Sequence, residues 1–120
     1  MNPQSPVRLL LSSPLSFGPG KAELLEKIDE LGSLQGAAAA MEMSYMKAWK
    51  FVKTLNASFR EPIVILHRGG KDQGGAELSK TGKEILALYH EAVSAAEKAA
   101  LPAIKRMRKL LAPDESKSQR

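Results

Sequence analysis

The chain has 120 residues, a net charge of +5 and a pI near 9.6, which favours a polyanionic partner, although a merely basic soluble protein would have the same balance. It contains no cysteine, which excludes disulfides, thiolate metal sites and cysteine nucleophiles. His67 and His90 are too isolated for a metal site, and we expect no cofactor. No apolar run could span a membrane and residues 7–11 are too short for a signal-peptide core, so we expect a cytoplasmic protein.

The first third of the chain predicts a strand, a loop and a helix within a single small domain. Residues 7–11 are apolar except for Arg8 and predict a short strand, whereas residues 12–20 contain two Pro and two Gly and predict a loop. Residues 21–31 predict a helix that Gly32 ends. Its apolar face consists of Leu24, Leu25, Ile28 and Leu31.

Residues 33–41 and 44–59 predict two helices joined by a tight turn near Glu42. Ser33 and Ser44 stand where N-caps are expected, and residues 36–40 are so small that another helix can approach closely. A short helix followed by a basic one indicates a helix-turn-helix, whose second helix enters the major groove of DNA.

The helix at 44–59 has an apolar face and a basic face at a period of 3.6. Ala48, Val52, Leu55 and Phe59 form the apolar stripe. Tyr45 and Trp49 at its edge could stack on bases, but their positions favour packing against the core. On this stretch alone, an ordinary amphipathic helix with a solvated lysine face is an equally good interpretation.

Residues 63–78 predict a β-hairpin in the position of a wing. Pro62 ends the preceding helix, residues 63–66 are apolar and largely β-branched, and residues 76–78 return after a Gly-rich turn. The turn carries Arg68 and Lys71 on backbone that can approach a phosphate closely. It lacks the strand-to-helix context and the Gly-Lys-Ser/Thr ending of a nucleotide-binding loop.

Residues 80–111 predict one long helix, capped by Ser79 or by Thr81 in a capping box with Glu84. Pro102 should kink or split it. Apolar residues recur at alternating spacings of three and four. The first turns of this seam should cover the domain's own core, and the later turns extend far enough to meet a partner helix. Lys105, Arg106, Arg108 and Lys109 form a basic patch that we interpret as a solvated helix end, and residues 112–120 predict a tail.

Four pieces of the sequence, in this order and spacing, resemble the N-terminal DNA-binding domain of ModE, the bacterial molybdate-responsive transcriptional regulators, within the LysR-like winged-helix group. They are Leu25-x-x-Ile28-Asp29-x-x-Gly32-Ser33, Met43-Ser44-Tyr45-x-x-Ala48-Trp49, the wing from Gly69-Gly70 to Gly74-Gly75-Ala76, and Leu78-Ser79-x-x-Gly82. The resemblance covers residues 7–111, and the Ser-Tyr-x-x-Ala-Trp piece followed by a double-Gly wing is fairly specific.

The resemblance implies a winged helix-turn-helix, a homodimer and a near-palindromic operator, with the recognition helix on residues 43–56. The expected DNA-binding residues are Ser33, Met43, Ser44, Met46, Lys47, Lys50, Lys53, Thr54, Arg68, Gly69, Gly70 and Lys71. The strand and the long helix are expected to build the dimer, through Val7, Leu9, Leu11, Leu86, Tyr89, Val93, Ala96, Ala100, Met107 and Leu110.

Three departures from the family pattern shape these expectations. The chain ends at Arg120, so we expect it to lack the molybdate-binding domain. Glu42 replaces the usual Gly of the turn; a left-handed backbone there would cost about 1–2 kcal/mol and place a negative charge near DNA. Lys71, Asp72 and Gln73 interrupt a wing that is otherwise almost all Gly in the family.

The predicted fold is therefore mainly α with a small β wing, namely a winged helix-turn-helix with a long C-terminal dimerisation helix. The predicted function is sequence-specific binding of double-stranded DNA as a dimeric transcriptional regulator. The alternative is a protein-interaction winged helix with weak or no specific DNA binding. We do not expect an enzyme, because no nucleophile–base pair or carboxylate cluster stands out. The residues specify no small-molecule effector.

Overall fold

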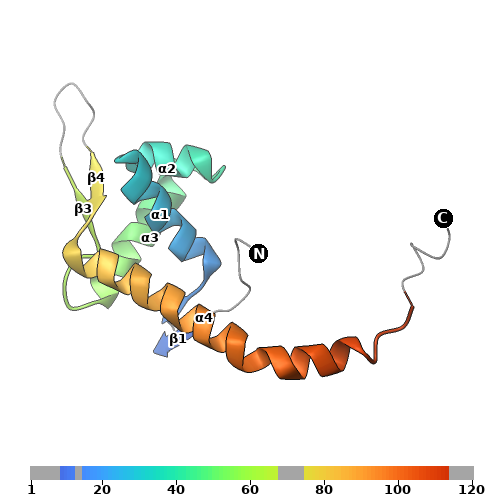
Figure 1. The fold of residues 1–120 in the computed structure, drawn as a ribbon. Coiled ribbons are helices and arrows are strands. Elements are labelled where there is room, and N and C mark those ends of the chain that lie inside the picture. The colour runs from blue at the N-terminus through green and yellow to red at the C-terminus, as the bar shows by residue number, and fades with distance from the viewer. Residues whose placement is uncertain (1–8, 13–14, 68–74, 114–120) are drawn as a thin grey trace.

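A computed structural model describes residues 9–12, 15–67 and 75–113. Three helices gather beside a two-stranded hairpin, and a long helix leaves from the base of that hairpin (Figure 1). The elements are β1 (Leu9–Ser12), β2 (Leu15–Phe17), α1 (Pro19–Leu31), α2 (Leu34–Ala40), α3 (Tyr45–Ser58), β3 (Val64–Leu66), β4 (Ala76–Leu78) and α4 (Lys80–Arg108). This confirms the predicted class, mainly α with a small β wing in a winged helix-turn-helix.

The N-terminal hairpin corrects the prediction of a loop over residues 12–20. β1 and β2 pair antiparallel, with Leu9 opposite Phe17, and α1 already begins at Pro19. A proline suits the first turn of a helix because its missing N–H would have no partner there. Phe17 is only 1% exposed and its ring centroid lies 5.1 Å from that of Tyr89 in α4, so burial of an aromatic ring outweighs the turn signals around it.

The core lies between α1, α2, α3 and the wing. α1 contributes Leu24, Leu25 and Ile28, all at 0% exposure, from the apolar face predicted for this helix. Ala37 and Ala38 are buried in α2, whose small residues allow close approach of its neighbours. Among the described residues no polar or charged side chain is fully buried, so the core between the three helices is formed by apolar side chains.

The wing is an antiparallel pair in which Val64 lies opposite Leu78 and Leu66 opposite Ala76. Val64, Ala76 and Leu78 are buried, whereas Ile65, Leu66 and Glu77 are exposed. β4 therefore alternates as a half-buried strand does, and β3 does not. The tip, with Arg68, Gly69, Gly70 and Lys71, lies outside the described residues, and so does the Lys71-Asp72-Gln73 interruption.

The start of α4 is fixed tightly against β3. The Ser79 hydroxyl accepts from the Gly82 N–H at 2.9 Å and donates to the Pro62 carbonyl at 2.6 Å. A Cβ at Gly82 would lie 2.3 Å from the Ile63 carbonyl oxygen, so only glycine fits there. Ser79 is therefore the N-cap, and the alternative capping box at Thr81 is wrong because the Thr81 hydroxyl instead donates to Glu61.

α4 is one continuous helix of 29 residues, about 43 Å long. It is not split at Pro102, and Figure 1 shows it bending in its second half. Tyr89 and Val93 are buried in the domain, but from residue 98 onward every residue through 113 is exposed except the half-buried Ile104. The first half of α4 thus completes the core, and the second half projects away from it.

Candidate nucleic-acid interface

The helix-turn-helix is built from α2 and α3, each capped by a serine as predicted. The Ser33 hydroxyl accepts from the Gly36 N–H at 2.9 Å, and the Ser44 hydroxyl accepts from the Lys47 N–H at 3.0 Å. Between the two helices Glu42 has a φ of 56°, a left-handed conformation that glycine adopts without strain. Ser33 and Ser44 thus define where the two helices begin, and their hydroxyl protons remain available to an acceptor.

Asn56, near the end of α3, connects this helix to the wing. Its side-chain oxygen accepts from the N–H groups of Ile63 and Val64 at 2.8 and 3.0 Å, and its side-chain nitrogen donates to the Val64 carbonyl at 3.0 Å. These three bonds satisfy backbone groups that would otherwise be buried without partners where the chain turns into β3. The orientation of α3 relative to the wing therefore depends on one amide side chain.

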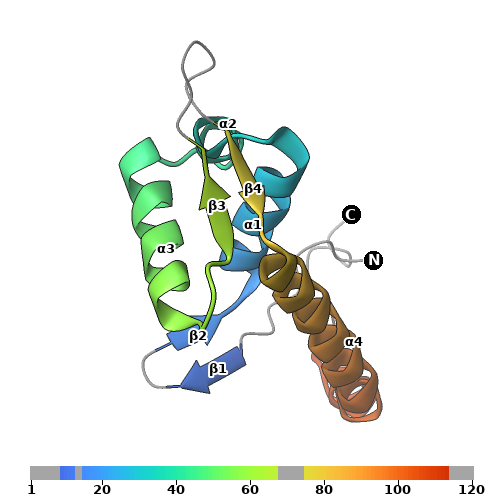
Figure 2. The same cartoon turned by 90° about the vertical axis from the view of Figure 1, so that its left-hand side faces the viewer.

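The outward face of α3 carries only positive charge. Lys47, Lys50 and Lys53 are exposed, and the 14 residues of this helix contain neither Asp nor Glu. Ser44, Thr54 and Met46, the last at 56% exposure, lie among them, while Met43 is half-buried against the core. Figure 2 shows α3 along one edge of the domain next to the β3–β4 hairpin, with α4 leaving on the other side.

Aromatic rings lie beneath two of these lysines. The Lys53 ammonium is 4.8 Å from the Trp49 ring centroid, and the Lys47 ammonium is 6.0 Å from that of Phe51. Trp49 is half-buried against the core, in line with its predicted position. Tyr45 is 51% exposed, so its predicted packing against the core is wrong; it lies in the first turn of α3, beyond the reach of the buried stripe.

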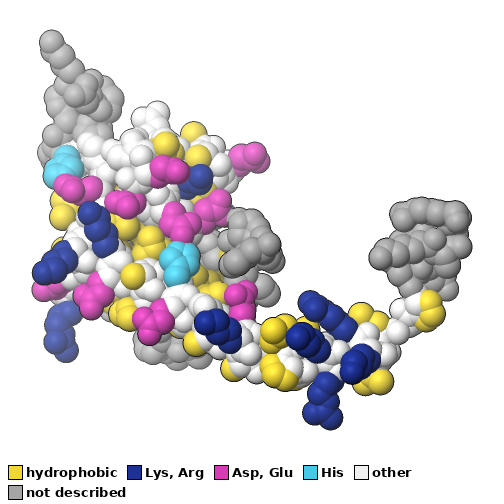
Figure 3. Space-filling model, viewed as in Figure 1, with side chains coloured by type: hydrophobic (Ala, Val, Ile, Leu, Met, Phe, Trp, Pro, Cys, Tyr) yellow, Lys and Arg dark blue, Asp and Glu magenta, His cyan; other side chains and the backbone are white. Residues whose placement is uncertain are grey.

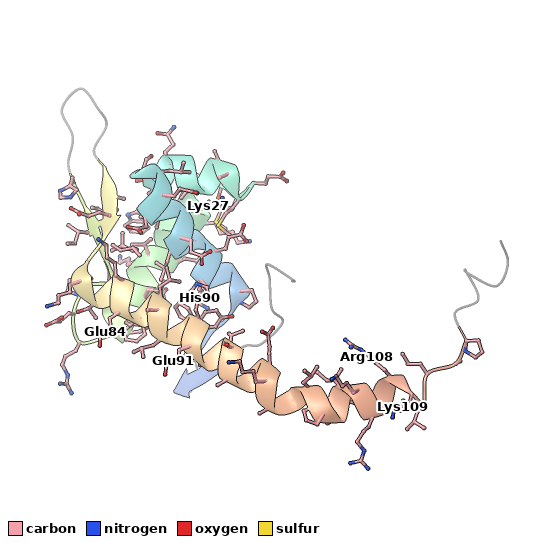
Figure 4. The ribbon with its side chains drawn as sticks, viewed as in Figure 1. Lys27, Glu84, His90, Glu91, Arg108 and Lys109 are labelled. Atoms are coloured by element: carbon pink, nitrogen blue, oxygen red, sulfur yellow. The ribbon has the colours of Figure 1, made fainter. Side chains whose placement is uncertain are left out.

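Carboxylates are concentrated on a different face, formed by α1 and the first half of α4. Glu26, Asp29 and Glu30 are exposed on α1, and the view in Figure 3 shows Asp and Glu side chains scattered over this face. Figure 4 shows Glu84 and Glu91 on the adjoining part of α4, where His90 Nε2 lies 2.6 Å from Glu26 Oε2. A polyanion is therefore attracted to the α3 edge and repelled from the α1/α4 face.

The residues predicted for the dimer interface do not form one surface in the isolated chain. Tyr89 and Val93 pack inside the domain, and Leu86 and Ala96 are half-buried. Ala100 and Met107 are exposed on the projecting half of α4, and Leu110 is exposed just beyond the end of this helix at Arg108. Leu9 and Leu11 belong to β1, and Val7 lies outside the described residues.

Phe17 and Asn56 were not singled out from the sequence. Phe17 is flanked by turn-forming residues that conceal its burial. One feature of the sequence points to Asn56: it is a polar residue next to Leu55 on the buried side of an amphipathic helix, a few residues before Pro62. A polar group in that place commonly bonds to the backbone that follows it.

The described parts of the chain hold no group of three or more His, Asp or Glu side chains suited to a metal ion. None of the helices in these parts combines the length and the apolar character needed to cross a bilayer.

A helix-turn-helix with a basic second helix, followed by a hairpin wing, defines a winged helix-turn-helix domain. No protein-family model matches the chain. It is 38% identical over 69 residues to the molybdenum transport protein ModE of Azotobacter vinelandii, covering 58% of this chain and 26% of that protein. It is 32% identical over 81 residues to the DNA-binding transcriptional dual regulator ModE of Escherichia coli K12, covering 68% of this chain and 31% of that protein.

The transcriptional regulator ModE of Haemophilus influenzae gives a similar value, 32% identity over 79 residues, or 66% of this chain and 31% of that protein. The chain is thus homologous to the N-terminal region of ModE, and the matched part spans only about a quarter to a third of those relatives. Among solved structures, the full-length LysR-type regulator LysG of Corynebacterium glutamicum aligns with a TM-score of 0.45 at 24% identity, over 78% of this chain and 28% of that chain.

Proposed function

We propose that this chain binds double-stranded DNA in a sequence-specific manner as a dimeric transcriptional regulator of the bacterial cytoplasm. The observation that carries the proposal is the outward face of α3, where Lys47, Lys50 and Lys53 are exposed on a helix without a carboxylate. Homology to the N-terminal region of ModE supports the same conclusion, because two of these relatives are named as transcriptional regulators and one of them as DNA-binding.

The contacts divide by chemistry. Lys47, Lys50 and Lys53 bind phosphates and groove edges, and the Ser44 and Ser33 hydroxyls bind phosphates near the helix starts. Met43, Met46 and Thr54 contact base edges, where a methyl or thioether group can pack against the thymine methyl. Arg68, Gly69, Gly70 and Lys71 of the wing tip are proposed to bind the flanking backbone or the minor groove.

The dimer is proposed to form through the projecting half of α4. Met107 is 60% exposed, Leu110 85% and Leu111 72%, values that leave these side chains in water unless a second helix covers them. Two copies paired in this way present two α3 helices to DNA, which favours an operator with an inverted repeat. The name of the Azotobacter vinelandii relative refers to molybdenum, but the matched region is only 26% of its length, so we propose no molybdate site.

One observation favours a different function. Glu42 is exposed in the turn that precedes α3, where its negative charge opposes an approaching phosphate. A winged helix with this residue could instead recruit a protein partner and bind DNA only weakly and without sequence preference.

A selection of binding sites from random duplexes at near-physiological salt tests the proposal. We expect enrichment of an inverted repeat, and an affinity that falls roughly 10³–10⁵-fold between about 50 and 200 mM salt if six to ten phosphates are contacted. Replacing Lys47, Lys50 and Lys53 with Ala should abolish DNA binding and leave the dimer intact, as measured by light scattering. The protein-interaction alternative gains support if no sequence is enriched and the triple variant is functionally unchanged.

A further inference from the structure

A cavity of about 330 Å³ lies between the start of α1, the turn after α2 and the first half of α3. Met41, Met43 and Phe51 provide its apolar walls, and the backbone of Gly18 and Gly20 closes one side. Its two charged lining residues are Lys21 of α1 and Lys47 of α3. This cavity directly adjoins the proposed DNA-binding face, because Lys47 belongs to both.

The two lysines converge on a single ring from different helices. The ammonium of Lys21 is 5.8 Å from the Phe51 ring centroid, and that of Lys47 is 6.0 Å from the same centroid. The ring attracts both cations, and the lining residues include no Asp or Glu; the exposed Glu42 stands between the lining residues Met41 and Met43. An anion bound in the cavity beside Phe51 would be attracted by both ammonium groups.

The adjoining first turn of α1 reinforces this positive potential. Gly18 supplies no side-chain cap, and no acidic residue lies in that turn. The positive end of the helix dipole is thus unneutralised beside the two lysines. The volume exceeds what a single phosphate requires, and Met41 and Phe51 can pack against the apolar side of a sugar.

We infer that this cavity binds a phosphate group together with part of its sugar, supplied by the DNA backbone beside the groove that α3 enters. The inference rests on the proposed function and extends it, because it assigns a backbone contact to Lys21, which lies in α1 and outside the helix-turn-helix. DNA binding then clamps one phosphate between α1 and α3.

The test compares Lys21→Ala with Lys27→Ala, which removes the same charge from the same helix but from a side chain paired with Glu30 at 3.4 Å. Both variants are titrated into a labelled duplex containing the selected operator, over a range of salt. Lys21→Ala should weaken binding on the order of tenfold and lower the slope of log affinity against log salt by about 1. Lys21→Arg should restore binding, and Lys27→Ala should match the wild type.

The outcomes separate this inference from the proposed function. If Lys50→Ala weakens binding while Lys21→Ala has the wild-type affinity and slope, the DNA-binding function stands and the inference is overturned. If the wild-type protein binds no DNA, both fail. Inorganic phosphate at constant ionic strength, followed by NMR at the Gly20 and Lys21 amides, tests the other source of this anion. Saturable shifts there, without any effect of Lys21 on DNA binding, would assign the cavity to a free anion.

Discussion

α3 and the projecting half of α4 have similar charge but differ in how they are held. α3 carries Lys47, Lys50 and Lys53 and no carboxylate; residues 98–113 carry five basic side chains and no carboxylate either. α3 is anchored by Ala48, Val52 and Leu55, all at most 2% exposed. Among residues 98–113, which the structure describes, no side chain is buried, and Figure 4 shows Arg108 and Lys109 far from the domain.

The difference teaches that positive charge becomes a recognition surface only where the backbone beneath it is fixed. The lysines of α3 project from a helix whose beginning is capped and whose end is bonded to the wing, so DNA binding need not order that helix. The projecting half of α4 has exposed apolar side chains that the described part of the chain leaves uncovered, and these are the side chains through which we propose that the dimer forms. Three substitutions test this contrast.

The largest effect is expected from Asn56→Ala, which removes the anchor at the end of α3. Two N–H groups and one carbonyl at the start of β3 lose their partners, and we expect a loss of about 2–3 kcal/mol in the free energy of unfolding. Urea denaturation measures this loss. DNA affinity should also fall, because the wing and α3 no longer keep their relative orientation.

Ser58→Ala is the matched control for Asn56→Ala. Ser58 is exposed in the same helix, and its hydroxyl bonds only to the Thr54 carbonyl within the helix, so we expect a change below about 0.5 kcal/mol. Equal stability losses in the two variants would show that Asn56 is not an anchor and that α3 is held by apolar packing alone.

The anchored region was also the more predictable from sequence. The caps at Ser33, Ser44 and Ser79 and the buried stripe of α3 follow from local chemistry and helical periodicity, which act within a few residues. The backbone strain at Glu42 could also be predicted, because a non-glycine residue stands where the family has Gly.

What the sequence did not predict depends on distant partners. Phe17 is buried because Tyr89, 72 positions later, lies against it. The role that we propose for Lys21 depends on its position beside Phe51 and Lys47 of α3. Tyr45 has an apolar ring in a favourable register but faces solvent, because register alone does not say how far the core extends. These are tertiary effects that periodicity cannot reveal.

The double variant Met107→Lys, Leu110→Lys should raise the dimer dissociation constant about tenfold, which corresponds to a loss of about 1.4 kcal/mol in the free energy of association. Two charges on the exposed seam repel their counterparts on the second copy and remove apolar contact. Analytical ultracentrifugation measures the dissociation constant. The unfolding of the domain at high dilution should be unchanged, because neither side chain touches the core.

Leu88→Lys with Ala95→Lys is the control for that seam. Both residues are exposed on α4 but lie off the seam, so the same charge is added without entering the proposed interface. If the seam variant and this control have the same dimer dissociation constant, the interface lies elsewhere. The exposed apolar residues at the end of α4 would then need another partner.

The smallest effect, and the one that separates backbone strain from charge, concerns Glu42. Glu42→Gly relieves the positive φ of 56° and should raise the free energy of unfolding by about 1 kcal/mol. Glu42→Ala removes the same charge but keeps a Cβ in the left-handed conformation, so its stability should stay near that of the wild type. If α3 is the DNA-binding helix, both variants should bind the operator more tightly, and to the same extent, because each removes a negative charge next to its first turn. If only Glu42→Gly raises the affinity for DNA, the cause is the backbone of the turn, which sets the orientation of α3. The negative charge of the carboxylate would then have no effect on the affinity.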